Sequence, residues 1–253
     1  MIELKNVSAG YSRENVIHQV SMSFPTGKVT VLLGPNGCGK STVLKTSLGL
    51  LPISGGEIYY GEIEIHQMKR KEIARKAAFL TQSRNHASIQ ALRMVLHGRF
   101  PYLSYPRKYS KKDYEIARKA MDRTGCGKYE DRNINELSGG QRQSVYFAMT
   151  LAQETETVFM DEPTTYLDIC HQLQLMDIAR SLAKQGKAVV LVLHDLSMAL
   201  QVADQIGLME EGRLLQVGTP EEIFQSGKLD QVFGIEVYRV NTTHGVRYYY
   251  TSI

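Results

Sequence analysis

Short runs of apolar residues alternate with longer amphipathic stretches along this chain. The runs have the length and the β-branched content of buried strands. These candidate strands are residues 29–33 (VTVLL), 77–81 (AAFLT), 157–160 (TVFM) and 187–193 (KAVVLVL). Apolar residues at helical spacing follow the first run from Lys40 to about Leu50, where Pro52 would stop the helix, and recur over residues 169–184. Strands that alternate with helices predict βαβ units and a parallel sheet.

The pattern changes over the middle of the chain and at its two ends. Between residues 83 and 136 it turns helical and polar. The opening IELKNVSAGY and the closing GVRYYYTSI have the alternation of antiparallel strands. The sequence therefore predicts an α/β fold in which residues 1–82 and 153–253 form one lobe, and residues 83–152 form an inserted helical lobe.

A glycine-rich segment joins the first buried strand to the first helix. It reads LGPNGCGKST and fits the pattern G-x-x-x-x-G-K-[ST], in which backbone N–H groups surround a polyphosphate. A glycine turn without a ligand is the alternative, but the segment ends where a new helix presents its free N–H groups and its positive dipole end. The candidate phosphate-binding residues are Gly34, Pro35, Asn36, Gly37, Cys38, Gly39, Lys40, Ser41 and Thr42.

A second glycine-containing motif, LSGGQRQ, begins at Leu137. Ser138 and Gln141 have the spacing of a capping box that closes the start of a helix. Capping does not explain Gly139 and Gly140, because each glycine in a helix costs up to about 1 kcal/mol relative to alanine. Two residues without side chains at a helix N-terminus predict a second anion site that another group approaches closely.

Together, these two motifs resemble the ATP-binding-cassette (ABC) ATPases, whose signature is LSGGQ, and the resemblance covers nearly the whole chain. It implies a phosphate-loop ATPase fold with a mixed-sheet core, an antiparallel β subdomain and an inserted α-helical subdomain. It also implies a head-to-tail dimer with a second copy of the chain, in which residues 138–141 of one copy close over the ATP held by the phosphate loop of the other. The cofactors implied are ATP and Mg²⁺.

The same resemblance assigns roles to residues outside the two motifs. In VFMDE, Asp161 organises the Mg²⁺ shell with Ser41, and Glu162 is the general base. Two successive residues of a strand face opposite sides, so these two acids are expected to act separately. The remaining implied roles are a Mg²⁺ contact for Gln82, a γ-phosphate contact for His194, a dimer loop at Asp168 and adenine stacking for Tyr11. Lys40 and His194 would stabilise charge during phosphoryl transfer.

Composition and charge narrow the function further. The chain has 253 residues, 43% hydrophobic and 22% charged, with a net charge of +4. Basic residues gather at 69–76 and 107–112, but no nucleic-acid motif accompanies them, so we expect solvated surfaces and no nucleic-acid partner. The longest apolar run, residues 188–193, is far shorter than the roughly 18 residues that indicate a membrane span. The start of the sequence lacks the pattern of a secretory signal, so we expect a cytosolic protein.

The three cysteines, Cys38, Cys126 and Cys170, do not form a C-x-x-C pair, which argues against a disulfide framework or a zinc knuckle. Cys38 lies two residues before Lys40 at a helix N-terminus. A cation and a helix dipole both favour the thiolate, so this position predicts a lowered pKa and fast alkylation, although a buried, inert thiol is the alternative.

Within the ABC family, residues 161–206 and the upstream HGRFPY look most like the ATPases of bacterial importers for iron-siderophores, haem and cobalamin. That likeness implies separate polytopic membrane subunits, indirect dependence on a substrate-binding protein, and a peripheral location on the cytoplasmic face of the membrane. Residues 101–106 with 107–112 are either a contact surface for the membrane subunits or a solvent loop. A soluble ABC ATPase of iron–sulfur cluster assembly is the alternative function.

Overall fold

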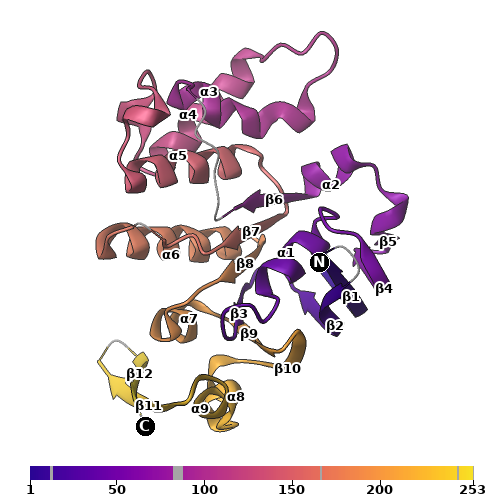
Figure 1. Cartoon of the computed structure of the whole chain (residues 1–253). Helices are drawn as coiled ribbons and strands as arrows, with labels where there is room; N and C mark the ends of the chain where they lie inside the picture. Colours follow the sequence, from indigo (N-terminus) through magenta and orange to yellow (C-terminus); the bar gives the residue numbers. More distant parts are fainter. Residues whose placement is uncertain (12–13, 82–87, 166, 244, 253) are drawn as a thin grey trace.

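The computed structural model describes residues 1–11, 14–81, 88–165, 167–243 and 245–252. Three sheets and the helices that pack on them make up this part of the chain (Figure 1). The six-stranded central sheet has the strand order β10-β9-β3-β8-β7-β6. Its strands are β3 (Val29–Leu33), β6 (Ala77–Leu80), β7 (Thr157–Asp161), β8 (Ala188–Val192), β9 (Gln205–Glu210) and β10 (Arg213–Gly218).

The central sheet is parallel except for β10, which pairs antiparallel with β9 at one edge. Every residue of β3, β7 and β8 is buried, which explains why these strands are mostly apolar and do not alternate with polar residues. Because the strands are parallel, the segments that follow β3, β7 and β8 all emerge at one edge of the sheet.

The central strands contribute to two hydrophobic cores, one on each face, because successive side chains alternate. One core joins Leu32, Phe159 and Val190 to the antiparallel sheet and to helix α1 (Lys40–Ser47). The other joins Val31, Met160 and Leu191 to the helices on the opposite face. These helices are α5 (Gly139–Ala152), α6 (Ile169–Lys184) and α7 (Leu196–Val202).

The antiparallel sheet has the order β2-β1-β4-β5 and packs on the central sheet through an edge-to-face contact of Phe24 with Phe159, whose ring centroids are 5.4 Å apart. Its strands are β1 (Ile2–Tyr11), β2 (Glu14–Phe24), β4 (Ile53–Tyr60) and β5 (Ile63–Glu64). The chain then passes through a 3₁₀ turn at Ile65–Gln67 and helix α2 (Arg70–Lys76).

Helices α3 (Ala91–Leu96), α4 (Lys111–Arg123) and α5 lie together on one side of the central sheet (Figure 1). A 3₁₀ helix, His97–Tyr102, follows α3, and shorter 3₁₀ turns occur at Gly127–Tyr129 and Ile134–Glu136. Buried Arg99 fastens this group internally, with Nε 3.0 Å from Asp113 and Nη1 2.9 Å from Glu154. The helical character predicted for residues 83–136 agrees with these elements, and the lobe boundaries at 82/83 and 152/153 stay a prediction.

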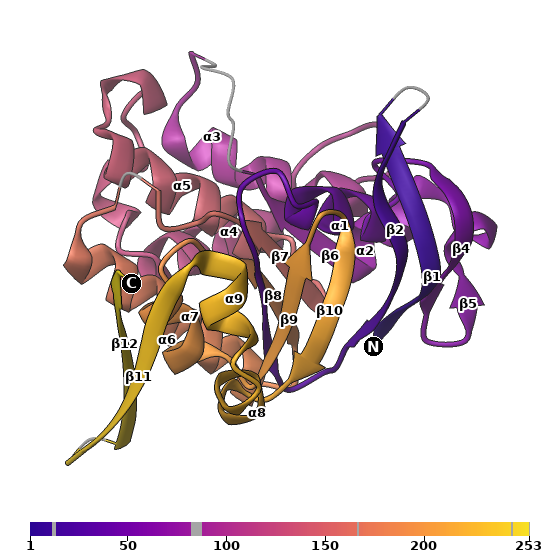
Figure 2. The same ribbon diagram turned by 60° about the horizontal axis from the view of Figure 1, so that its bottom comes forward.

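The C-terminal part contains α8 (Pro220–Gln225), α9 (Lys228–Phe233) and a two-stranded sheet of β11 (Ile235–Thr242) and β12 (Gly245–Ser252) (Figure 2). The closing strand pairs antiparallel with β11, and the opening strand with β2 and β4. Both predicted antiparallel strands are therefore present, in separate sheets.

Helix α1 ends earlier than the sequence predicted. It stops at Ser47, because Gly49 takes the left-handed conformation (φ 64°). The N–H of Gly49 donates to the carbonyl of Thr46 (3.0 Å) and that of Leu50 to Lys45 (2.9 Å), which is a Schellman motif. Glycine ends this helix before Pro52 is reached.

Among the described residues, the helices are all too short or too polar to cross a bilayer.

Candidate nucleotide-binding site

The glycine-rich loop lies between β3 and α1, and its backbone needs glycine at two positions. A Cβ at Gly34 would lie 2.1 Å from the carbonyl oxygen of Met209, and one at Gly39 would lie 2.6 Å from Ile17. Gly39 is also the N-cap of α1, with φ 100°. The free N–H groups of the first turn of α1 are therefore directed into the hollow of the loop, where they can bind an anion.

A pocket of about 260 Å³ lies in this hollow. Its wall combines segments that are far apart in the sequence: the β1–β2 strands, the loop, the start of α1 and the segment after β7. The lining residues are Tyr11, Val16, Asn36, Gly37, Gly39, Lys40, Ser41, Thr42 and Glu162. The structure thus brings most of the predicted phosphate-loop residues together with the predicted base and the predicted adenine-stacking tyrosine.

Lys40 is buried, and its ammonium group lies inside the loop. Nζ donates to the carbonyl oxygens of Gly34 (2.7 Å) and Pro35 (2.8 Å). These carbonyls hold the positive charge beside the pocket, where phosphate oxygens can compete for it. Lys40 can therefore neutralise a polyphosphate without leaving the loop.

The prediction of an activated Cys38 thiol is wrong. Cys38 is only 5% exposed, and burial raises its pKa, although the neighbouring Lys40 acts in the opposite direction. Sγ lies 3.8 Å from Nζ of Lys40, so the cation is close, but desolvation of the thiolate outweighs it. Cys38 contributes its backbone to the loop, while its side chain packs in the core under the loop.

Ser41 and Asp161, the two described residues predicted to act at Mg²⁺, are in direct contact. Oγ of Ser41 donates to Oδ1 of Asp161 over 2.8 Å. Burial raises the pKa of Asp161, and the Ser41 hydrogen bond only partly offsets this. A cation beside this carboxylate would relieve the cost of burying its charge. Mg²⁺ characteristically uses one or two protein oxygens and completes its shell with phosphates and water, so this pair fits it.

Glu162 lies directly after β7, and its backbone is unusual. The strand ends at Asp161, and Glu162 takes φ 48°, a left-handed conformation that costs a non-glycine residue about 1–3 kcal/mol. The sequence-based argument from strand alternation therefore does not apply to Glu162, because this residue is outside the strand. Its N–H donates to the carbonyl of Val192 (3.2 Å), which anchors the turn to β8.

His194 follows β8 and contacts the Glu162 carboxylate, with Nε2 2.6 Å from Oε1. The side chain of Glu162 is 15% exposed and that of His194 48%. A carboxylate held this way at the edge of the pocket can accept a proton from a water molecule that attacks a bound phosphate.

The LSGGQ segment has the local structure that its sequence predicted. Ser138 caps α5 by accepting from the N–H of Gln141 (3.3 Å), and Gln141 Oε1 accepts from the N–H of Ser138 (3.1 Å). Ser138 and Gly139 are exposed. Within the described part of the chain, the pocket around the loop has no lining residue from α5, so this helix start presents its N–H groups elsewhere.

The remaining predicted residues fall at the margins of the pocket or outside it. Tyr11 is 48% exposed and accepts a hydrogen bond from Lys45 (3.2 Å), which also lies over its ring. Asp168 is exposed and caps α6, accepting from the N–H of His171 (2.9 Å). Two hydrogen bonds from His171 lower the pKa of Asp168; the one from its backbone N–H has the larger effect and the one from its ring the smaller. Gln82 lies outside the described residues.

Two features escaped the sequence reasoning. Val16 lines the pocket from β2, and a valine in a strand carries no indication of a ligand. Gln143, the last residue of LSGGQRQ, is buried and donates to the carbonyl of Pro163 (2.7 Å), next to Glu162. The available indication of a buried hydrogen bond was a glutamine at a position of the helix where the neighbouring buried residues are mostly apolar.

Comparison with known proteins identifies the family. The ABC transporter family pattern matches residues 17–165. The achromobactin transport ATP-binding protein CbrD of Dickeya dadantii (strain 3937) is 39% identical over 93% of this chain and 88% of its own length. The iron(3+)-hydroxamate import ATP-binding protein FhuC of Bacillus subtilis (strain 168) is 38% identical over the same shares. The dimeric structure of MJ0796, a bacterial ABC transporter cassette, superimposes with a TM-score of 0.77 at 27% identity, covering 87% of this chain and 99% of that one.

Proposed function

This chain belongs to the ABC transporter family of ATPases, and from that membership we propose that it powers the import of an iron–siderophore complex. The observation that carries the ATPase part is the pocket in which Lys40, Ser41 and Glu162 line one hollow. The relatives named above supply the substrate class, because they are import or transport proteins for achromobactin and iron(3+)-hydroxamate. Haem and cobalamin, the other substrates considered from the sequence, belong to importers of the same type.

The residues of the pocket divide the work of phosphoryl transfer, which consists mainly of positioning and charge stabilisation. The N–H groups at the start of α1 and the ammonium group of Lys40 hold the phosphates. Glu162 orients and deprotonates the attacking water. His194, which contacts that carboxylate from the neighbouring strand end, would also contact the γ-phosphate. Tyr11 offers an exposed ring to the adenine at the outer margin of the pocket.

Ser41 and Asp161 are the proposed protein contacts of Mg²⁺, and Gln82 is a third by resemblance. When bound, the ion would supply positive charge that neutralises the negative charge of the phosphates during phosphoryl transfer. Oγ of Ser41 and Oδ1 of Asp161 lie 2.8 Å apart, close enough for one ion to contact both oxygens.

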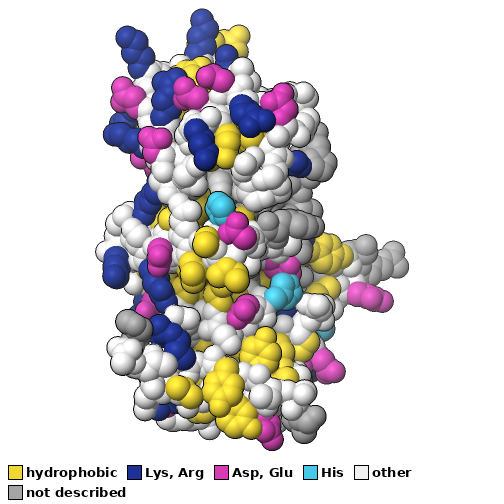
Figure 3. All heavy atoms as spheres, turned by 90° about the vertical axis from the view of Figure 1, so that its left-hand side faces the viewer, with side chains coloured by type: hydrophobic (Ala, Val, Ile, Leu, Met, Phe, Trp, Pro, Cys, Tyr) yellow, Lys and Arg dark blue, Asp and Glu magenta, His cyan; other side chains and the backbone are white. Residues whose placement is uncertain are grey.

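The site is proposed to be completed by a second copy of the chain. The start of α5, with Ser138, Gly139, Gly140 and Gln141, is exposed or half-buried and lies outside the pocket of its own chain. In a head-to-tail dimer it would face the γ-phosphate held by the partner. Figure 3 shows that one side of the molecule carries a group of exposed apolar side chains, with acidic residues and histidines beside them and Lys and Arg mainly above them and along one edge. Apolar side chains of this kind are suited to the buried part of an interface. Asp168 would lie in that interface.

A polytopic membrane subunit is the proposed second partner. A groove of about 360 Å³ lies between the end of α1, helix α2 and strand β6. Leu48, Ile73 and Phe79 give it an apolar floor, and Leu50 at its border is 64% exposed. An amphipathic helix from a membrane subunit fits this kind of surface. The chain would then be peripheral, on the cytoplasmic side of the membrane, with a substrate-binding protein acting through the membrane subunit.

Uptake measurements test the proposed function. Deleting the gene in its own host should abolish accumulation of an ⁵⁵Fe-labelled siderophore, and the parent gene should restore it, whereas a Lys40→Ala copy should not. Unchanged uptake of every iron chelate in a strain without a second such ATPase would contradict the proposal. The alternative, a soluble ATPase of iron–sulfur cluster assembly, is not favoured by the relatives. If it were correct, deleting the gene would lower the activities of iron–sulfur enzymes and leave siderophore uptake unchanged.

A further inference from the structure

Helix α5 is tied directly to the segment that carries the base. Gln143 is 5% exposed, and its Nε2 donates to the carbonyl oxygen of Pro163 over 2.7 Å. Pro163 is buried and has no N–H, so its carbonyl is the one backbone group through which it can form a hydrogen bond. Gln143 therefore satisfies a buried acceptor that immediately follows Glu162.

The segment after Glu162 is also held at its far end, by α6. Nε2 of Gln172 donates to the carbonyl of Leu167 (3.0 Å), and Asp168 caps the helix. Within the segment, the N–H of Thr165 donates to the carbonyl of Glu162 (3.3 Å). Because hydrogen bonds join this segment to α5 near its start and to α6 near its end, we expect a displacement of α5 relative to α6 to shift Pro163.

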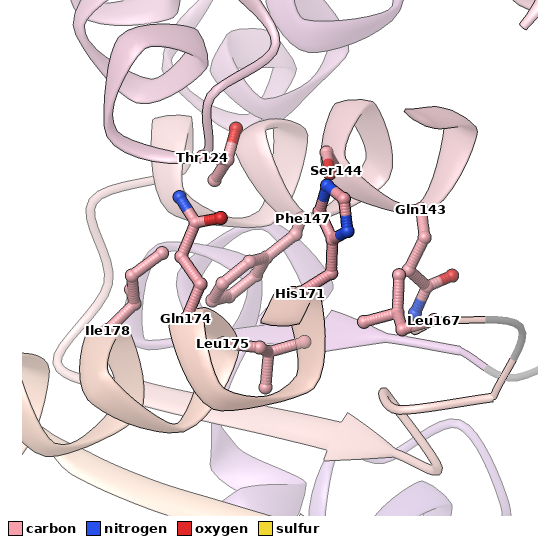
Figure 4. Close-up of a pocket in the computed structure, with 9 residues that line it drawn as sticks. All are labelled: Thr124, Gln143, Ser144, Phe147, Leu167, His171, Gln174, Leu175 and Ile178. Atoms are coloured by element: carbon pink, nitrogen blue, oxygen red, sulfur yellow. The ribbon is translucent and has the colours of Figure 1, made fainter. Parts of the chain in front are cut away.

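A small cavity lies between the two helices. It has a volume of about 20 Å³, enough for about one water molecule. Figure 4 shows its lining, with Gln143 and Phe147 on α5, His171 and Gln174 on α6, and Leu167 on the connecting segment. The amide of Gln143 points from α5 toward Leu167 (Figure 4).

We propose that Gln143 is a positioning residue that couples the two ATP sites of the dimer. This inference rests on the proposed head-to-tail arrangement, in which Ser138 acts on the partner's ATP while Glu162 acts on the chain's own. Ser138 and Gln143 belong to one helix, five residues apart, or about 7 Å along its axis. When the partner's ATP draws in the start of α5, Gln143 moves the carbonyl of Pro163 and, with it, the backbone of Glu162. Each chain therefore adjusts its own base according to whether the other site is filled.

Kinetics of the purified full-length chain test this coupling. Gln143→Met keeps the length of the side chain and removes the donor. We expect it to lower kcat by about 10-fold or more, because a small misplacement of a base is costly. The Hill coefficient for ATP should fall from a value approaching about 2 toward about 1. ATP binding to the monomer should be unchanged, since Gln143 lies outside the pocket.

Gln174→Met, in the same cavity but on α6, is the matched control and should retain both the parent kcat and the parent Hill coefficient. Gln143→Asn, too short to reach the carbonyl but still polar, should behave as Gln143→Met does, and it decides the question if the methionine variant does not fold. Parent-like kcat and Hill coefficient in the Gln143 variants, or an equal loss in Gln174→Met, would overturn the proposal. ATP-driven dimerisation of a Glu162→Gln chain is measured separately, and its absence would refute the proposed dimer and this coupling with it.

Discussion

Nε2 of His194 lies 2.6 Å from Oε1 of Glu162, although the two residues are 32 positions apart in the sequence. The contact exists because β7 and β8 are parallel neighbours, with Asp161 paired to Val192, so the residues that follow them emerge side by side. The left-handed backbone at Glu162 then turns its carboxylate toward the pocket and toward His194. Strained backbone conformations cost stability and occur mostly at functional sites, which supports the proposed role of Glu162 as the base.

Replacing Glu162 by glutamine should therefore separate binding from hydrolysis. Glu162→Gln keeps the shape of the side chain but cannot accept a proton, so ATP turnover should fall at least about 10²-fold while ATP affinity is retained. With Mg-free ATP, the variant should accumulate as a dimer, measured by light scattering after size exclusion. Hydrolysis near the parent rate would remove Glu162 from its proposed role.

The start of α5 gives a second test, aimed at the partner's site. Ser138→Arg places a long cation at the exposed N-terminus of the helix, where it would block the approach of a second chain. We expect hydrolysis to be abolished and nucleotide affinity of the monomer, measured with a fluorescent ATP analogue, to be unchanged. Loss of binding to the monomer would show that Ser138 acts within its own chain and that the two-chain site is wrong.

The sequence predicted correctly those elements whose spacing of apolar or capping residues fits only one kind of structure. The strand at residues 29–33 has the predicted bounds, and so does the helix Ile169–Lys184, because their apolar spacing is unambiguous. The capping box at Ser138 is present, because its two residues interact only locally. The end of α1 was misplaced, since Gly49 and Pro52 can each stop a helix and the pattern did not rank them.

What the sequence could not give is the balance of competing effects in three dimensions. Cys38 has both a cation and a helix N-terminus beside it, yet burial raises its pKa, and the depth of burial depends on how the loop packs against distant residues. The φ of 48° at Glu162 and the bond from Gln143 to Pro163 likewise depend on contacts between separate elements. Motifs identified the residues, and the fold determined what each of them contacts.

The buried ion pair of Arg99 predicts a large effect on stability. Arg99 and Asp113 are 7% and 11% exposed at their side chains, so Arg99→Met would leave a buried carboxylate without its cation. We expect the free energy of unfolding in urea to fall by about 3 kcal/mol. The control is Arg118→Met, whose partner Glu130 and own side chain are far more exposed, and which should cost less than about 1 kcal/mol. Equal losses would refute the burial argument.

The same pair predicts how that loss depends on pH. Burial acts to raise the pKa of Asp113, but hydrogen bonds from Ser110 and Arg99 outweigh it and hold the pKa below its ordinary value of 3.8. A lowered pKa stabilises the folded state above the unfolded-state value, and this stabilisation is lost as pH falls through the folded-state pKa. The difference in unfolding free energy between the parent and Arg99→Met should therefore be largest near neutral pH and shrink below about pH 4. A difference that stays constant down to pH 2 would contradict the assignment.

The cysteines offer a final test, in which the structure reverses the order of reactivity that the sequence predicted. Cys38 and Cys126 are buried and burial raises both pKa values, whereas Cys170 is exposed in the first turn of α6. Brief maleimide treatment followed by mass spectrometry should therefore label Cys170 first, with Cys38 and Cys126 reacting only on unfolding.

Cys170 also lies two residues after Asp168 and next to Ile169, which is 74% exposed, on the surface proposed to meet the second chain. In the Glu162→Gln background, ATP should slow labelling of Cys170 several-fold by forming the dimer. The control carries Ser138→Arg as well, which binds ATP but should not dimerise, and its Cys170 should be labelled equally fast with and without nucleotide. Protection in both backgrounds would mean that ATP changes α6 within one chain. Lack of protection in the Glu162→Gln chain without Ser138→Arg would place this surface outside the dimer interface.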